Sequence, residues 1–154
     1  MVFESFGKVV HTHDEPGEYF YFTPACTRER KVGTGMQSMT LTGSSIPDRS
    51  GAPLAVSAVM NYQVLDAIAY AYSVDDPFAY IQNQGAEVLR RVCAKFPYLS
   101  KSEPSISKNS SFLGTCLREL TQQRVAICGV EITSMEIMEA NYAPEVAQAL
   151  LQVQ

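Results

Sequence analysis

Two histidines near the start of the chain are the first residues that could do chemistry. His11 and His13 alternate along one predicted strand, so both imidazoles would lie on the same face, where Asp14 could join them around a metal ion. Cys26 could also form a thiolate pair with either histidine. No further ligand follows at a metal-site spacing, and nothing in the sequence brings Cys26 to the histidines. We therefore expect solvated histidines and no metal site.

The rest of the chain offers no recognisable catalytic pattern. It has no G-x-S-x-G nucleophile motif, no H-E-x-x-H metal motif and no glycine-rich phosphate loop, and the Gly-Thr-Gly at 33–35 is too short to be one. The adjacent carboxylates Asp75 and Asp76 suit a helix cap better than an acid–base pair. We predict a protein that is not an enzyme and that binds no cofactor.

Composition and charge exclude other classes of protein. The chain has 154 residues, 46% hydrophobic and 18% charged, which is ordinary for one globular domain. A net charge of -4 argues against a general nucleic-acid binder, because phosphate neutralisation needs clustered lysine and arginine. The four cysteines form no C-x-x-C pair, which favours buried or free thiols in a reducing cytosol. With no signal peptide recognised, we expect the glycosylation sequon at Asn109 to be an unmodified polar loop.

One stretch, Leu54 to Val74, has about the length of a membrane span. Its apolar residues alternate with polar or small ones from Leu54 to Val64, which predicts a long strand with one apolar face. Asn61, Gln63 and Asp66 would also be costly near the centre of a bilayer. We therefore expect no membrane span here.

The remaining elements follow from the spacing of apolar residues and from turn signals. Short β runs at 7–10 and 18–22 predict a hairpin, and the strand at 37–42 leads through a wide loop at 43–51 into the long strand. Asp76 and Pro77 start an amphipathic helix, whose predicted apolar side is Phe78, Ile81, Gly85, Val88, Leu89 and Val92. A second helix has a predicted apolar stripe of Leu113, Cys116, Leu117 and Leu120. This order predicts an α+β fold, with amphipathic helices packed on one face of a curved, mostly antiparallel sheet.

The last stretch changes from strand to helix. Residues 129–137 have strand spacing although neither face is purely apolar, and Pro144 suits the first position of a helix. That helix has an apolar stripe and no stop signal, so we expect it to continue as the start of a coiled coil. Its first contacts in an assembly are predicted at Val146, Leu150 and Val153.

Several blocks together resemble a known family. The run PGEYFYFTPAC at 16–26 is similar to the hairpin that opens stomatin-type domains, and PLAVSAVMNYQV at 53–64 resembles the family's long strand. Leu89, Arg90 and Val92 match its "LR-x-V" signature, and 129–146 resembles its closing strand and exit helix. The chain is thus identified as a stomatin/prohibitin/flotillin (SPFH) domain, closest in appearance to stomatin-like proteins, with a core at 1–142 and an assembly helix at 143–154. Gln63 departs from the pattern, since the family usually has a basic residue there.

The resemblance implies a membrane-associated scaffold on the cytoplasmic side. Such domains form homo-oligomers, contact membrane lipids, and organise lipid microdomains or regulate membrane proteins such as a channel or a protease. The competing reading is a soluble module that holds a peptide or a lipid at its sheet edge or hairpin.

Membrane-proximal residues are predicted beside the opening hairpin, because aromatic side chains favour the membrane interface and basic ones favour anionic headgroups. They are Tyr19, Phe20, Phe22, Arg28, Arg30 and Lys31. The aromatic run also suits a core strand, and the basic cluster a solvated edge. Cys26, which follows the aromatic run, is a candidate for palmitoylation.

Overall fold

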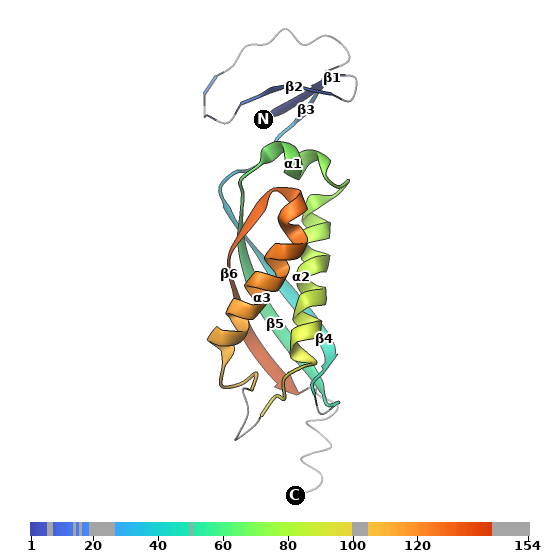
Figure 1. The fold of residues 1–154 in the computed structure, drawn as a ribbon, viewed down its shortest axis with the longest axis vertical. Coiled ribbons are helices and arrows are strands. Elements are labelled where there is room, and N and C mark those ends of the chain that lie inside the picture. The colour runs from blue at the N-terminus through green and yellow to red at the C-terminus, as the bar shows by residue number, and fades with distance from the viewer. Residues whose placement is uncertain are drawn as a thin grey trace, which may run out of the picture.

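The computed structural model describes residues 1–5, 8–13, 15, 17–18, 27–49, 51–99 and 105–142. Within them lie two three-stranded sheets, three α-helices and one short 3-10 helix (Figure 1). The elements in chain order are β1 (Val2–Ser5), β2 (Lys8–Thr12), β3 (Thr27–Arg30), β4 (Met36–Pro47), β5 (Pro53–Val64), α1 (Ala67–Tyr72), α2 (Pro77–Cys93), α3 (Ser110–Val125), η1 (Ala126–Cys128) and β6 (Val130–Tyr142).

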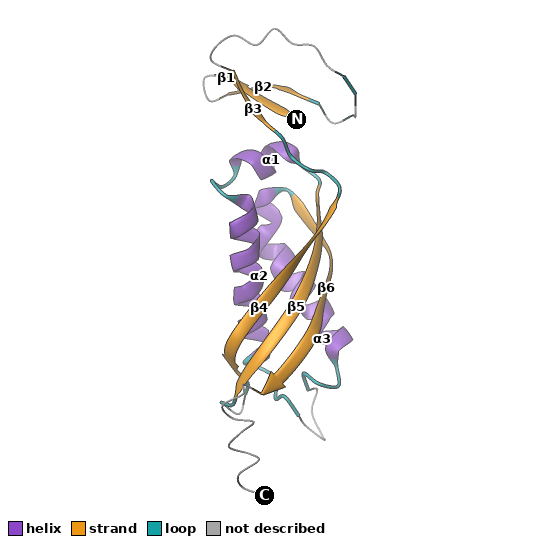
Figure 2. Ribbon diagram, turned by 180° about the vertical axis from the view of Figure 1, so that it is seen from behind, coloured by secondary structure: helices purple, strands orange, loops and turns teal. Residues whose placement is uncertain are grey.

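The long sheet has the order β4-β5-β6, and both strand pairs are antiparallel. Side chains of β5 alternate between buried and half-buried along the whole strand, as its sequence pattern predicted. Helices α2 and α3 cover one face of this sheet, and Figure 2 shows the opposite face with no described element over it. The predicted α+β fold, with helices packed on one face of an antiparallel sheet, is confirmed.

Strand β6 contains two irregularities that explain why its sequence showed no clean apolar face. Its register against β5 shifts once between Ile132 and Ser134, and again between Ile137 and Glu139. Each shift adds one residue to β6, so the inward-facing positions change parity twice. The residues that oppose the inward side chains of β5 are Val130, Ile132, Met135, Ile137, Ala140 and Tyr142.

The small sheet has the order β2-β1-β3 and lies at the end of the molecule beyond α1 (Figure 1). Strand β2 pairs with β1, a strand that the sequence pattern did not predict. The second run of the predicted hairpin, 18–22, lies outside the described residues from Tyr19 onward.

One predicted strand boundary was wrong, and one short helix was not predicted. Strand β4 continues through Gly43 to Pro47 by way of a register shift, so the predicted wide loop is reduced to a tight connection before β5. At the other end of β5, Asp66 caps the short helix α1, which was not predicted. Its carboxylate oxygen accepts hydrogen bonds from the backbone N–H groups of Ile68 at 2.9 Å and Ala69 at 3.0 Å.

Helix α2 begins as predicted, because the Asp76 carboxylate accepts a hydrogen bond from Ala79 N–H at 3.1 Å and Pro77 follows. Its buried side differs from the predicted one at two positions, since Phe78 is 48% exposed and Cys93, which was not predicted there, is buried.

Helix α3 buries a stripe that differs from the predicted one. Leu113 and Leu117 are buried as predicted, but Thr121 and Val125 continue the stripe with a spacing of four. Leu120 therefore turns outward, with 42% of its surface exposed, and Cys116 is half-buried. The prediction that these two side chains belong to the core stripe was wrong.

Candidate functional site

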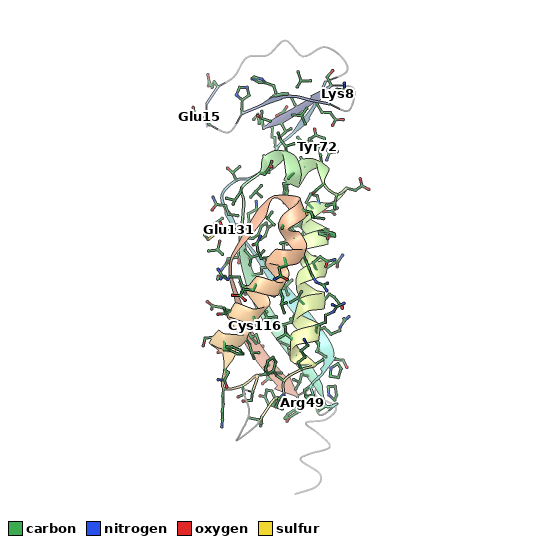
Figure 3. All side chains as sticks on the ribbon, in the orientation of Figure 1. Lys8, Glu15, Arg49, Tyr72, Cys116 and Glu131 are labelled. Atoms are coloured by element: carbon green, nitrogen blue, oxygen red, sulfur yellow. The ribbon has the colours of Figure 1, made fainter. Side chains whose placement is uncertain are left out.

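The outer strand of the small sheet exposes apolar side chains. Every residue of β2 from Lys8 to His11 is exposed, and the Val9 and Val10 side chains are 38% and 64% exposed. Lys8, labelled in Figure 3, lies beside these valines in sequence. Exposed valines next to a lysine at one end of the molecule form a surface suited to a membrane interface or to a partner protein.

Arg30 and Lys31, both predicted near the membrane, have different environments. The Arg30 guanidinium donates a hydrogen bond to the Ala71 carbonyl at 2.5 Å and lies 4.9 Å from the centre of the Tyr72 ring. Arg30 therefore connects the small sheet to α1. The Lys31 side chain is 74% exposed and lies 3.7 Å from Glu29, which leaves its ammonium accessible from solvent.

The other predicted site residues lie outside the described part of the chain. They are Tyr19, Phe20, Phe22, Cys26, the side chain of Arg28, and the assembly positions Val146, Leu150 and Val153. Their roles at a membrane or in an assembly stay predictions.

The uncovered face of the long sheet, called the open face below, carries small, polar and acidic side chains. Strand β5 contributes Ala55, Ser57, Val59, Asn61 and Gln63, all half-buried. Strand β6 adds three exposed glutamates, Glu131, Glu136 and Glu139. Because helices cover only the other face (Figure 2), these side chains form a surface that a partner could contact.

A second surface lies on the outer side of α3. Phe112 and Leu120 are 53% and 42% exposed, and half-buried Cys116 lies midway between them. Ile127, in η1 just after the helix, is 58% exposed. The spacing of four from 112 to 120 places these side chains on one side of the helix, so they form a row, called the outer stripe below. The sequence pattern missed this surface because it assigned Cys116 and Leu120 to the core.

An open groove of about 470 Å³ runs between α3 and β6. Its lining residues include Ser110, Ser111, Thr115 and Arg118 of α3 and Thr133, Ser134 and Glu136 of β6. Gly114 lets the helix lie this close, since a Cβ there would be 2.5 Å from the Met135 carbonyl oxygen.

Gln122 connects α3 to the edge of β6 next to this groove. Its amide donates a hydrogen bond to the Val130 carbonyl at 2.9 Å and accepts one from Ile132 N–H at 2.6 Å. The side chain thus occupies backbone groups of β6 that another strand could otherwise pair with. This contact explains how α3 is held beside the strand.

The buried side chains of Cys93 and Tyr62 are ionisable and lie in the core. Burial raises the pKa of the Cys93 thiol to about 11, which keeps it protonated and weakly nucleophilic at neutral pH. Burial, with Tyr70 nearby, raises the pKa of Tyr62 to about 12, and its hydroxyl donates a hydrogen bond to Gln37 at 2.8 Å. The rings of His11 and His13 are 4.6 Å apart, and no group of three potential metal ligands occurs among the described residues.

The geometry is therefore that of a domain with several contact surfaces. No helix among the described residues has both the length and the hydrophobicity needed to cross a bilayer. A search of curated proteins found no significant match. The model of the SPFH domain / Band 7 family matches residues 1–154, and this family consists generally of membrane-associated, non-enzymatic scaffolds. The chain belongs to the SPFH domain / Band 7 family.

Proposed function

We propose that this domain is a stomatin-like scaffold that associates with the cytoplasmic side of a membrane, self-assembles, and organises lipid microdomains or regulates a membrane protein such as a channel or a protease. The observation that carries this proposal is the family match over residues 1–154, because membrane-associated scaffolding is the general role of that family.

The small sheet supports a membrane-facing role for its end of the molecule. Val10 is 64% exposed on β2. Moving an exposed apolar side chain from water into the interfacial region of a bilayer lowers the free energy. Lys31 has an accessible ammonium, and a basic side chain near an anionic leaflet contributes about 1 kcal/mol. Arg30 is already bound to α1, so Lys31 is the better candidate for a headgroup contact.

The predicted residues outside the described part complete the proposal. Tyr19, Phe20, Phe22 and Arg28 would extend the membrane-facing end, and an acyl chain on Cys26 would strengthen its attachment. Val146, Leu150 and Val153 would make the first contacts of a coiled coil between neighbouring copies.

Vesicle flotation tests the membrane contact. The wild-type chain should float with vesicles of phosphatidylcholine and phosphatidylserine, and less with phosphatidylcholine alone. Replacing Lys31 by glutamine should weaken binding to the anionic vesicles about fivefold, because one cationic contact is lost. Replacing Val10 by aspartate should weaken binding to both kinds of vesicle, because an apolar contact is replaced by a charge.

Lys108→Gln is the matched control, since Lys108 is an exposed lysine just before α3, and the small sheet and α3 are separate elements in Figure 1. It should float like the wild type. A wild-type chain that remains below both kinds of vesicle would overturn the membrane part of the proposal. That result would favour the competing function, a soluble peptide-binding module, for which the groove between α3 and β6 is the observation in support.

A further inference from the structure

The outer stripe of α3 is an apolar row without a described partner. Phe112, Cys116 and Leu120 follow one side of the helix, and Ile127 extends the row into η1. Single exposed apolar residues are common on protein surfaces, but a row along a helix is typical of a contact surface.

Basic side chains flank this stripe. Arg124 donates a hydrogen bond to Gln84 of α2 at 3.0 Å, which identifies the side of α2 that faces α3. Arg91 follows Gln84 by seven residues, so it shares that side of α2, and Lys95 lies in the turn just after the helix. Both are exposed.

The acidic residues of the two helices do not cancel this charge. Glu87 pairs with Arg91 at 3.0 Å and with Arg90 at 3.5 Å, and Glu119 is the only acidic residue of α3. The layer formed by α2 and α3, called the helix layer below, therefore carries the apolar outer stripe and more positive than negative side chains.

The open face of the sheet has the opposite character. None of β4, β5 and β6 contains a lysine or an arginine, whereas β6 carries Glu131, Glu136 and Glu139. All three are exposed, and the described residues form no ion pair with any of them. Along the centre of this face run the small side chains of Ala55, Ser57 and Val59, which leave room for a helix ridge.

We propose that the helix layer of one copy of this chain packs on the open face of the next copy. The outer stripe would lie along the small side chains of β5, and Arg91 and Lys95 would approach the β6 glutamates. A second copy is the occupant because the two surfaces of the same chain are complementary in charge. This inference rests on the proposed self-assembly and names the surfaces that carry it.

The two surfaces lie on opposite sides of the domain, as Figures 1 and 2 show together. A contact between them is therefore head-to-tail, and each added copy leaves one surface of each kind free. Such heterologous contacts produce rings when the rotation between copies closes and filaments when it does not.

The test uses two variants that each damage one surface. Leu120→Asp places a charge in the outer stripe, and the double variant Glu136→Lys with Glu139→Lys reverses the charge of the open face. All three positions are solvent-accessible, so both variants should fold, which circular dichroism melting would verify. In sedimentation velocity, each variant alone should self-associate about tenfold or more weakly than the wild type.

Mixing the two variants gives the decisive result. The intact sheet face of Leu120→Asp should bind the intact helix layer of the glutamate variant, so an equimolar mixture should form heterodimers and nothing larger. The matched controls are Leu99→Asp and Asp75→Lys, both at exposed positions that belong to neither surface, and these should assemble like the wild type.

Three outcomes would contradict the proposal. Variants that assemble as well as the wild type, or a mixture that remains monomeric, would overturn this contact and leave self-assembly standing. A wild-type chain that is monomeric at every concentration would overturn both the contact and the proposed self-assembly.

Discussion

The two faces of strand β5 differ although their residues alternate along one stretch of chain. Met60 and Tyr62 point into the core and are fully buried, whereas Val59 and Asn61 point to the open face and stay half-buried. Both faces contain apolar side chains, but only one is covered by helices. The comparison shows that the same period-two pattern that builds the core also leaves an uncovered surface for another molecule.

Alanine substitutions at two adjacent positions of β5 should give the largest difference in the free energy of unfolding. Met60→Ala removes a fully buried side chain and should lower the free energy of unfolding by about 2–5 kcal/mol. Val59→Ala removes a half-buried side chain from the open face and should cost less than about 1 kcal/mol. Urea denaturation of both variants measures the contrast. Equal losses would mean that the open face is covered in the free protein.

The pH dependence of stability probes the covered side through Cys93. Burial raises the pKa of its thiol from 9.0 to about 11, so the folded chain keeps a proton that the unfolded chain releases. This stabilisation is fully present below pH 9.0 and is lost as the pH rises toward 11, at a cost of about 2 kcal/mol. Cys93→Ala should therefore lose less stability than the wild type over this range in urea titrations. Identical pH profiles would show that the thiol is not desolvated.

The attachment of α3 to β6 gives the smallest expected effect. Gln122→Ala should lower the free energy of unfolding by about 1 kcal/mol, because the Val130 carbonyl and Ile132 N–H lose their hydrogen bonds near solvent. Gln123→Ala, at the exposed neighbouring position, should leave stability nearly unchanged. Thermal melts of the two variants that coincide would contradict the role given to Gln122.

The elements predicted correctly have strong local signals. Helix α2 has an Asp cap, a proline at its first position and a long amphipathic repeat, and each of these acts within a few residues. Strand β5 alternates over its whole length because one face is core. Such features need no knowledge of the rest of the fold.

The errors in the fold arose where distant contacts decide the structure. The two register shifts of β6 appear only once β5 is beside it, and the extension of β4 depends on pairing across the shift at Gly43. Helix α1 is a single capped segment after a long strand, too short for a clear period. Leu120 was assigned to the core because a spacing of three or four fits either side of a short helix, and packing against β6 selected Thr121 instead.

The candidate surfaces could be predicted only in part. The resemblance to SPFH domains indicated a scaffold, and the family match confirms membership. The outer stripe and the open face required the fold, because the packing of the helices on the sheet decides which side of α3 and which face of the sheet stay exposed. The basic cluster in the sequence could not show that the Arg30 guanidinium binds α1 and is therefore less available to a lipid headgroup.

Cross-linking on vesicles tests the central claim, a membrane-associated scaffold that self-assembles, most directly. The wild-type chain would be floated on vesicles of phosphatidylcholine and phosphatidylserine, treated with an amine-reactive cross-linker and separated on a denaturing gel. We predict that the floated fraction contains a ladder of dimers and larger species. A floated fraction that contains only monomer, or no protein at all, would contradict the claim.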